Sequence, residues 1–237
     1  MVRAMKFNPP LISATLLKRY KRFLADVRFD DGTEATAHCA NPGSMMGLAE
    51  PGATVWLSKS DNPKRKLAWS WELIDDESSL VGVHTGKANA LVEEAIKAGT
   101  IAELCGYETL KREVKYGENS RIDLLLEDPA RPATYVEVKS VTLSRTEGLA
   151  EFPDSKTARG AKHMAELAEM AKQGHKAVVF FLVQRSDCTQ MQPAADIDPK
   201  YAESLSAALA AGVEVLCYSC RLSPDEITLD RRLEVAI

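Results

Sequence analysis

The chain has 237 residues, 45% of them hydrophobic, and a formal net charge of −4. This length supplies the core of one large or two small domains, and the acidic balance argues against wrapping of nucleic acid over the whole surface. The longest apolar run, residues 177–183, is too short to cross a membrane, the N-terminus lacks a hydrophobic signal, and five scattered cysteines suit a reducing compartment. We therefore expect a soluble cytoplasmic protein that has no membrane partner.

Short strands and turns dominate the first part of the chain. Asp30-Asp31-Gly32 is a hairpin signal between two strand-like segments, residues 23–29 and 33–39. Further strands are expected at residues 54–57, 67–74 and 79–84. About five strands at this spacing favour a small closed barrel of the OB type. The sequence predicts this barrel domain over residues 1–84.

Basic side chains gather around the strands of the predicted barrel. Lys64, Arg65 and Lys66 fall in one loop, beside strands that carry tryptophans, and this mixture suits a surface that holds nucleic acid by charge and base stacking. The alternative is that the tryptophans belong to the core and the lysines only keep edge strands soluble. The charges are the stronger indication, and we predict that these three residues bind nucleic acid. The loop at residues 41–44 has the composition of a turn that could also present amides to an anion.

From Thr85 onward helices and strands alternate. Helices are expected at residues 87–98, at residues 158–173, and from Asp198-Pro199 to Gly212. Strands are expected at residues 113–116, 121–126, 135–143, 177–184 and 213–222. Alternation of this kind predicts an α/β domain with a mixed sheet over residues 85–237.

Two neighbouring strand segments carry a set of charged residues. Asp123 lies in the first, and Glu137 and Lys139 lie two positions apart in the second, so they project from the same face. Two carboxylates offer the hard oxygen ligands that Mg²⁺ prefers, and an ammonium beside them can orient or help to deprotonate an attacking water. These residue types together suit phosphodiester hydrolysis. The alternative is a solvated cross-strand pair, which arises by chance in a chain of this size.

Further candidate residues lie on the predicted helices. Glu94 stands on the helix that leads into the sheet and could hold a second metal ion, although spacing alone does not separate it from Glu93. Arg159, Lys162 and His163 share one face near the start of the next helix, where cations and the helix dipole would both attract phosphate. An ordinary solvated face is an equally good interpretation of these three residues.

Several short motifs follow one another along nearly the whole chain. They are residues 41–45, 60–66, 120–123, 135–139, 152–154, 159–163 and 183–187. Together they resemble the bacterial sugar fermentation stimulation protein family. The resemblance implies an N-terminal OB-like domain, a C-terminal domain similar to the PD-(D/E)XK nucleases, DNA binding, and a link to the expression of sugar (maltose) utilisation genes. It also implies that Asp123 is the nuclease aspartate, Glu137 the second acidic ligand and Lys139 the catalytic lysine, and Glu94 is similar to the helix glutamate that such folds often add.

The sequence supports two main hypotheses, both with DNA as the partner. In the first, the protein cleaves DNA phosphodiesters with Mg²⁺ or Mn²⁺ held by Asp123, Glu137 and Glu94, while Lys139 aligns the water. In the second, it is a non-catalytic DNA-binding regulator of sugar utilisation genes, and the nuclease-like fold only positions the duplex. A metal-dependent phosphatase for small molecules is a weaker third hypothesis, because the basic barrel would then have no role. Whether the protein cleaves DNA, and whether it forms a homo-oligomer, stay open.

Overall fold

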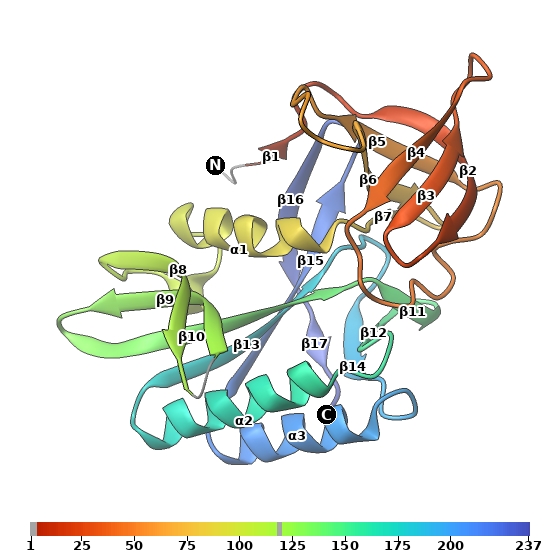
Figure 1. The fold of residues 1–237 in the computed structure, drawn as a ribbon. Helices are drawn as coiled ribbons and strands as arrows, with labels where there is room; N and C mark the ends of the chain where they lie inside the picture. Colours follow the sequence, from red (N-terminus) through yellow and green to blue (C-terminus); the bar gives the residue numbers. More distant parts are fainter. Residues whose placement is uncertain (1–3, 118–119) are drawn as a thin grey trace.

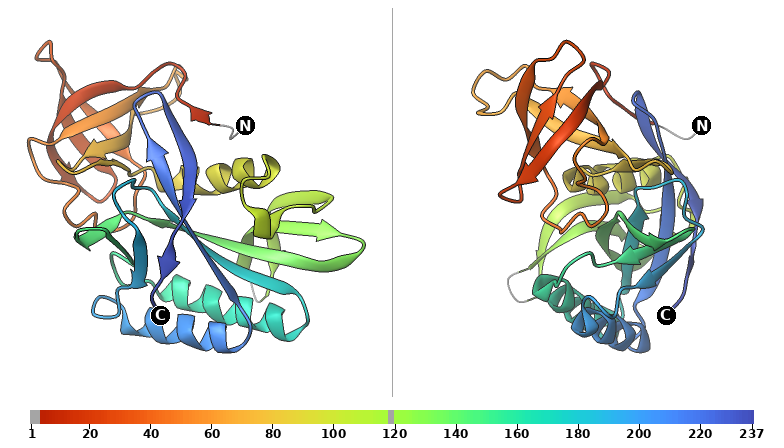
Figure 2. Two further views of the ribbon diagram at one scale, coloured as in Figure 1. Left: turned by 180° about the vertical axis from the view of Figure 1, so that it is seen from behind. Right: turned by 90° about the vertical axis from the view of Figure 1, so that its right-hand side faces the viewer.

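A β-barrel packs against a larger body in which helices cover a sheet. The computed structural model describes residues 4–117 and 120–237, and its two bodies are seen in Figures 1 and 2. The fold is mixed α/β, as predicted. The start of the N-terminal segment, expected to lack a signal, and part of the turn expected between the strands at 113–116 and 121–126 lie outside the described residues.

The barrel is a six-stranded sheet in the order β4-β3-β2-β5-β6-β7, and a parallel pairing of β4 with β6 closes it. Its strands are β2 Ile12–Tyr20, β3 Leu24–Arg28, β4 Glu34–Cys39, β5 Thr54–Lys59, β6 Trp69–Asp75 and β7 Leu80–Gly82. Trp71 fills the centre, and its indole N–H donates to the Leu73 carbonyl at 2.9 Å. Trp69 is only half-buried and packs on Phe29, with ring centroids 4.9 Å apart. The predicted hairpin and the OB-type barrel are confirmed.

The second body is a seven-stranded sheet in the order β1-β16-β15-β13-β10-β9-β8. Its strands are β1 Met5–Lys6, β8 Thr109–Tyr116, β9 Ser120–Asp128, β10 Arg131–Val141, β13 Lys176–Val183, β15 Glu214–Leu222 and β16 Glu226–Arg232. The central strands β10, β13 and β15 are parallel, whereas the outer pairings are antiparallel. The sheet is therefore mixed, as the alternation of strands and helices predicted.

Helices cover both faces of this sheet. The helices are η1 Thr85–Lys87, α1 Ala88–Lys97, η2 Ala102–Leu104, α2 Ala158–Lys172 and α3 Pro199–Ala210. Helix α1 packs on one face, and α2 and α3 lie side by side on the other (Figure 1). Continuous apolar runs on the central strands bury both of their faces, so each face has a core of its own. The three predicted helices are confirmed to within about two residues at each end.

Some short elements have no signal in the sequence. A four-stranded sheet joins β11 Leu143–Thr146, β12 Leu149–Phe152, β14 Gln190–Pro193 and β17 Glu234–Val235. In addition, β1 pairs with β16, so the first described residues belong to the α/β sheet and the barrel begins at β2. Strands of two to four residues are too short to show a period of two, which is why the sequence did not reveal them.

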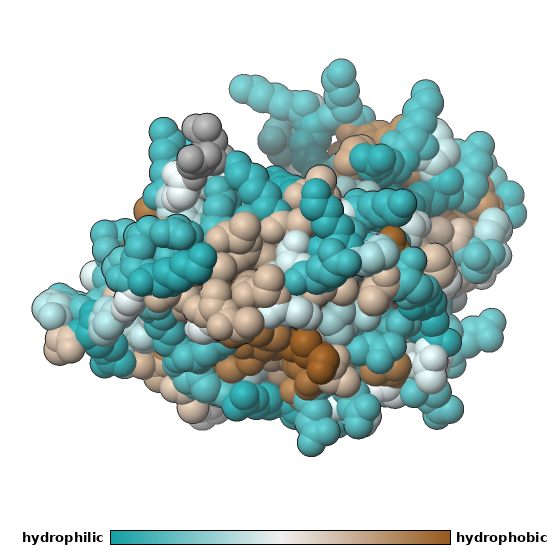
Figure 3. All heavy atoms as spheres, turned by 90° about the horizontal axis from the view of Figure 1, so that it is seen from below, coloured by the Kyte–Doolittle hydropathy of each residue, from teal (hydrophilic) through white to brown (hydrophobic). Residues whose placement is uncertain are grey.

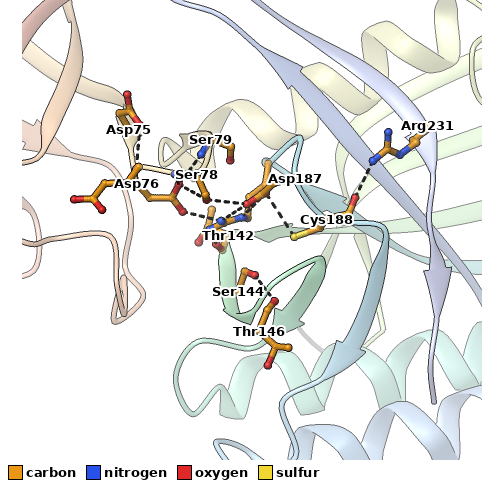
Figure 4. A network of polar contacts seen from close by, with 12 residues as sticks. Asp75, Asp76, Ser78, Ser79, Thr142, Ser144, Thr146, Asp187, Cys188 and Arg231 are labelled. Atoms are coloured by element: carbon orange, nitrogen blue, oxygen red, sulfur yellow. Dashed lines mark hydrogen bonds and ion pairs between the residues drawn. The ribbon is translucent and has the colours of Figure 1, made fainter.

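A buried ionic network ties the barrel to the α/β body (Figure 4). Arg185, which is 4% exposed, donates through Nη2 to Asp76 of the barrel at 2.7 Å and to Asp187 at 2.6 Å. Its Nη1 donates to the Thr142 carbonyl at 3.2 Å, and the Ser78 hydroxyl of the barrel donates to Asp187 at 3.1 Å. A guanidinium bonded on both sides in this way fixes how the two bodies sit against each other.

Figure 3 shows the side of the molecule seen from below, where hydrophilic residues surround a central area of apolar residues. Within residues 4–117 and 120–237, no helix has both the length and the apolar character needed to span a bilayer.

Candidate active site

Asp123 lies where β9 and β10 part from each other. The last pairing between the two strands joins Leu124 to Val136. Beyond this pair, the backbone of β10 bonds to the side chain of Asp123 in place of the backbone of β9. The backbone N–H of Val138 donates to Asp123 Oδ2 at 2.8 Å, and the Asn89 amide on α1 donates to Oδ1 at 2.8 Å. The carboxylate is thus held between the sheet and the helix that precedes it.

Glu137 and Lys139 project together from β10, as the period of two predicted. Glu137 is 2% exposed, and Lys139 Nζ donates to its Oε1 at 2.8 Å. The ammonium is itself nearly enclosed, with a side-chain exposure of 12%. A charged pair this deep in the protein is costly to desolvate unless further bonds support it.

That support comes from His163 on α2. Its Nδ1 contacts Glu137 Oε1, and Arg159 Nε donates to its Nε2 at 3.2 Å. Because Nε2 accepts this bond, the network assigns the ring proton to Nδ1, which therefore donates to Glu137. Arg159, His163 and Glu137 form a chain of hydrogen bonds that ends on the carboxylate.

The start of α2 is fixed in a way that places these two residues. Thr157 caps the helix, since its Oγ1 accepts from the Gly160 N–H at 3.0 Å, and Asp198 in turn accepts from the Thr157 N–H at 2.7 Å. A Cβ on Gly160 would stand 2.8 Å from Thr157 and 3.1 Å from Tyr201, so only glycine allows this close approach. The glycine that follows Arg159 in the sequence is explained by this contact.

The two carboxyl groups differ in how readily they ionise. Burial, together with the negative charge of Glu137, raises the pKa of Asp123 to about 6. Burial also acts to raise the pKa of Glu137, but the hydrogen bond from His163 and the charge of Lys139 outweigh it and hold this pKa below its usual value. Glu137 is therefore the first of the two to ionise, and Asp123 keeps its proton up to about pH 6.

A divalent cation fits these groups. Glu137 Oε2 is buried and has no hydrogen-bond partner in the described part of the chain, so one lone-pair face of the carboxylate is unused beside Asp123. Within the described ranges, no cluster of three or more His, Cys, Asp or Glu side chains is close enough to form a metal cage. Mg²⁺ does not require one, because it commonly binds through one or two carboxylates and keeps several waters.

The other predicted site residues lie elsewhere. Glu94 faces the opposite side of α1, in a hollow beside β1 and β16, and Glu93 pairs with Lys97 at 2.6 Å. The helix side chain that reaches Asp123 is Asn89, four residues before Glu93, which the sequence did not single out. A helical offset of one residue rotates a side chain by about 100°, and for this reason spacing could not choose among these positions.

The basic residues divide between the site and the surface. His163 is buried against Glu137, so it does not share the exposed face on which the helical spacing had placed it. Lys162 is exposed and lies 3.6 Å from Glu166. Lys64, Arg65 and Lys66 are exposed in the loop between β5 and β6, and Arg65 donates to Ser70 at 2.9 Å. The structure thus brings His163 and Arg159 to the carboxylates and leaves the loop cations at the surface of the barrel.

The raised pKa of Asp123 predicts how pH affects metal binding. Without a cation, Asp123 in the folded state keeps its proton to about pH 6, whereas an ordinary aspartate releases it near 3.8. The protonated group therefore stabilises the fold at low pH. This stabilisation is lost as the pH rises from about 3.8 to about 6. A cation competes with the same proton. We expect the Mg²⁺ affinity, measured calorimetrically, to fall about tenfold per pH unit below pH 6. Equal affinities at about pH 5 and about pH 8 would contradict this, and Asp123→Asn should bind weakly with little pH dependence.

Two family models match this chain, each over a different part of it. Residues 17–83 match the family model described as "SfsA N-terminal OB domain", and residues 86–226 match "Sugar fermentation stimulation protein RE domain". Proteins described as sugar fermentation stimulation protein homologs include one of Paramagnetospirillum magneticum, 59% identical with 95% of each chain covered. Another, of Rhodospirillum centenum, is 58% identical and covers 98% of this chain and 100% of the relative.

A solved structure is similar over nearly the whole chain. It is described as Pyrococcus furiosus SfsA in complex with Ca²⁺, and it matches with a TM-score of 0.90 and 29% sequence identity, covering 98% of both chains. The barrel and the α/β body therefore have the same arrangement in both proteins.

Proposed function

Because the chain belongs to the sugar fermentation stimulation protein family, we propose that it binds DNA and hydrolyses phosphodiester bonds at Asp123, Glu137 and Lys139 with Mg²⁺ or Mn²⁺. The observation that carries this proposal is the pair of carboxylates at the point where β9 and β10 part, with one buried oxygen of Glu137 left without a partner among the described residues. An ammonium 2.8 Å from the other oxygen completes the set of groups that the reaction uses.

Each residue has a distinct role in this proposal. Asp123 and Glu137 would hold the cation, which when bound polarises the phosphate and the attacking water. Lys139 can hold a water next to Glu137, since an ammonium has three donors and the carboxylate uses only one of them. His163 keeps Glu137 ionised and turned so that Oε2 stays available, and Arg159 keeps His163 in the tautomer that does so. These two are positioning residues.

The comparison with the Pyrococcus furiosus structure adds support for a divalent cation. That protein is described in complex with Ca²⁺, a hard cation that takes the same oxygen ligands as Mg²⁺. Ca²⁺ is therefore a useful probe of cation binding for this chain, beside Mg²⁺ and Mn²⁺.

A second candidate function is DNA binding without cleavage, in regulation of sugar utilisation genes. The observation that favours it is the exposed basic loop between β5 and β6, which can bind phosphates whether or not the carboxylate site reacts. The test is incubation of the purified protein with labelled single-stranded and duplex DNA in Mg²⁺, Mn²⁺ or EDTA, scored for both mobility shift and cleavage. Binding without cleavage in every divalent ion would favour the regulator.

The basic loop gives a prediction for DNA affinity. The change Lys64→Ala with Lys66→Ala should weaken binding, and the slope of log affinity against log salt should fall by about one unit for each phosphate that is no longer neutralised. Arg65 is not mutated in this variant, because its guanidinium donates a hydrogen bond to Ser70. Fluorescence anisotropy at several salt concentrations measures both quantities.

The matched control is Lys172→Ala with Lys200→Ala, which removes two exposed cations from α2 and α3 and leaves the loop between β5 and β6 unchanged. If the two double variants bind DNA equally well, the loop has no specific part in binding.

A further inference from the structure

A cavity of about 330 Å³ lies between the two bodies. The barrel contributes the loop at residues 41–43 and Arg22, and the α/β body contributes residues 151–157 together with Ser140 and Thr142 of the β10 end. Thr157, which lines the cavity, is the N-cap of α2, so the cavity lies at the end of α2 from which His163 reaches Glu137. Its volume is at the lower end of the roughly 300–1,000 Å³ that is usual for ligand pockets.

Two cations line the cavity without an ion-pair partner among the described residues. Glu151 is buried and already receives two bonds from Arg145, at 2.7 and 2.8 Å. Asp154 accepts from the Met45 N–H at 3.0 Å. By contrast, Arg22 and Lys156 line the cavity and form no ion pair or hydrogen bond with any described residue. Both carboxylates are thus satisfied, whereas both cations lack a partner within the described ranges.

A neutral donor also faces the cavity without a partner. Thr142 is 7% exposed, and its hydroxyl makes no hydrogen bond within residues 4–117 and 120–237. Ser140 accepts a bond from Gln184 at 2.7 Å, which leaves its own hydroxyl proton to donate. Both hydroxyls can therefore donate to an acceptor that enters the cavity.

The walls of the cavity are held rigidly. Arg19 donates to three carbonyls of the barrel loop, those of Asn41, Gly43 and Ser44, at 2.9 to 3.1 Å. The Ser44 hydroxyl donates across the interface to the Asp154 carbonyl at 2.6 Å. The backbone groups of this loop are therefore already used in hydrogen bonds that hold the loop in place. The loop forms a wall of the cavity and is not a set of free amides that could bind an anion. A cavity fixed in this way loses little entropy when a ligand binds.

We propose that this cavity binds one phosphate group of a single, unpaired nucleic-acid strand, next to the phosphate that lies at the carboxylate site. This inference rests on the proposed function and adds its substrate class. Arg22 and Lys156 neutralise the phosphate, and the hydroxyls of Thr142 and Ser140 donate to its oxygens. The cavity is the size of one nucleotide unit and does not accommodate a duplex, so the strand that enters it is unpaired.

The test measures binding in EDTA, so that cleavage plays no part. The probes are a labelled single-stranded DNA of about 12 nucleotides and the corresponding blunt duplex. One variant is Arg22→Asn with Lys156→Ala, in which asparagine tolerates the positive φ of 65° at position 22. A second, Ser155→Tyr, fills the cavity without changing the charge. The charge-matched control is Lys172→Ala with Lys200→Ala.

Both cavity variants should weaken single-strand binding by roughly tenfold, as loss of hydrogen bonds to a charged group does, with a smaller effect on the duplex. A single methylphosphonate linkage, moved along the strand, should weaken wild-type binding at one position and have no effect there in the Arg22/Lys156 variant. Unchanged single-strand binding in both cavity variants, with wild-type protein still binding DNA, would overturn the cavity site alone. Absence of DNA binding by the wild-type protein would overturn the proposed function and the cavity site together.

Discussion

Replacing Lys139 with alanine is expected to abolish metal-dependent cleavage, with a loss on the order of 10²–10⁴-fold in rate. The ammonium stands 2.8 Å from Glu137 Oε1, is nearly enclosed, and belongs to the only lysine or arginine that pairs with Glu137 among the described residues. DNA affinity in EDTA should stay close to that of the wild type, because one ammonium among many cations contributes little to phosphate binding. Single-turnover cleavage of labelled DNA measures the first quantity, and anisotropy measures the second.

The chain provides a matched control for this change. Lys97 pairs with Glu93 at 2.6 Å, but its side chain is 62% exposed and lies outside the site. Lys97→Ala therefore removes a similar lysine–glutamate pair and should leave cleavage unchanged. Full cleavage by the Lys139 variant would show that the activity belongs to a contaminant or to another site.

Replacing Arg185 with methionine is expected to lower the free energy of unfolding by about 3–5 kcal/mol. The guanidinium is 4% exposed and bonds Asp76 and Asp187 at once, and its removal leaves two carboxylates without their cation at the interface of the two bodies. Methionine keeps a similar volume, so the loss reports the charge and not a cavity. Urea unfolding followed by circular dichroism measures it.

Arg221→Met is the comparison for this experiment. Arg221 pairs with Asp230 at 2.6 Å, as short a contact as the buried pair, but its side chain is 76% exposed. Exposed pairs contribute about 0–1 kcal/mol, so this variant should unfold nearly as the wild type does. Equal losses in the two variants would mean that burial does not set the strength of the Arg185 network.

The parts of the site that could be predicted from the sequence depend on strand geometry. A period of two requires Glu137 and Lys139 to share a face, and the resemblance pointed to Asp123 as their partner, so all three lie together as expected. Helical residues were harder. Near the start of α2 the apolar stripe is not yet defined, and the sequence could not show that His163 turns inward while Lys162 turns outward.

The longer helices and strands could be predicted from the sequence, whereas the shortest strands could not. The hairpin of β3 and β4 has a turn signal between two strands of five and six residues, and it could be located closely. The pairing of β1 with β16 joins residues more than 200 positions apart through a strand of two residues, and nothing local encodes it. Long-range pairing of this kind is decided by the packing of the complete chain.

The position of β1 also determines how far the barrel can swing. Phe7 and Leu11 are buried in the core beneath α1, and the Phe7 N–H donates to the Asp225 carbonyl at 2.8 Å, so the chain is anchored before it enters the barrel and again where it leaves at η1. A module tethered at both ends cannot rotate about one linker as a terminal domain does. The barrel behaves as an insertion within the α/β body, and a fragment that began at η1 would expose the apolar surface that Phe7 and Leu11 now cover.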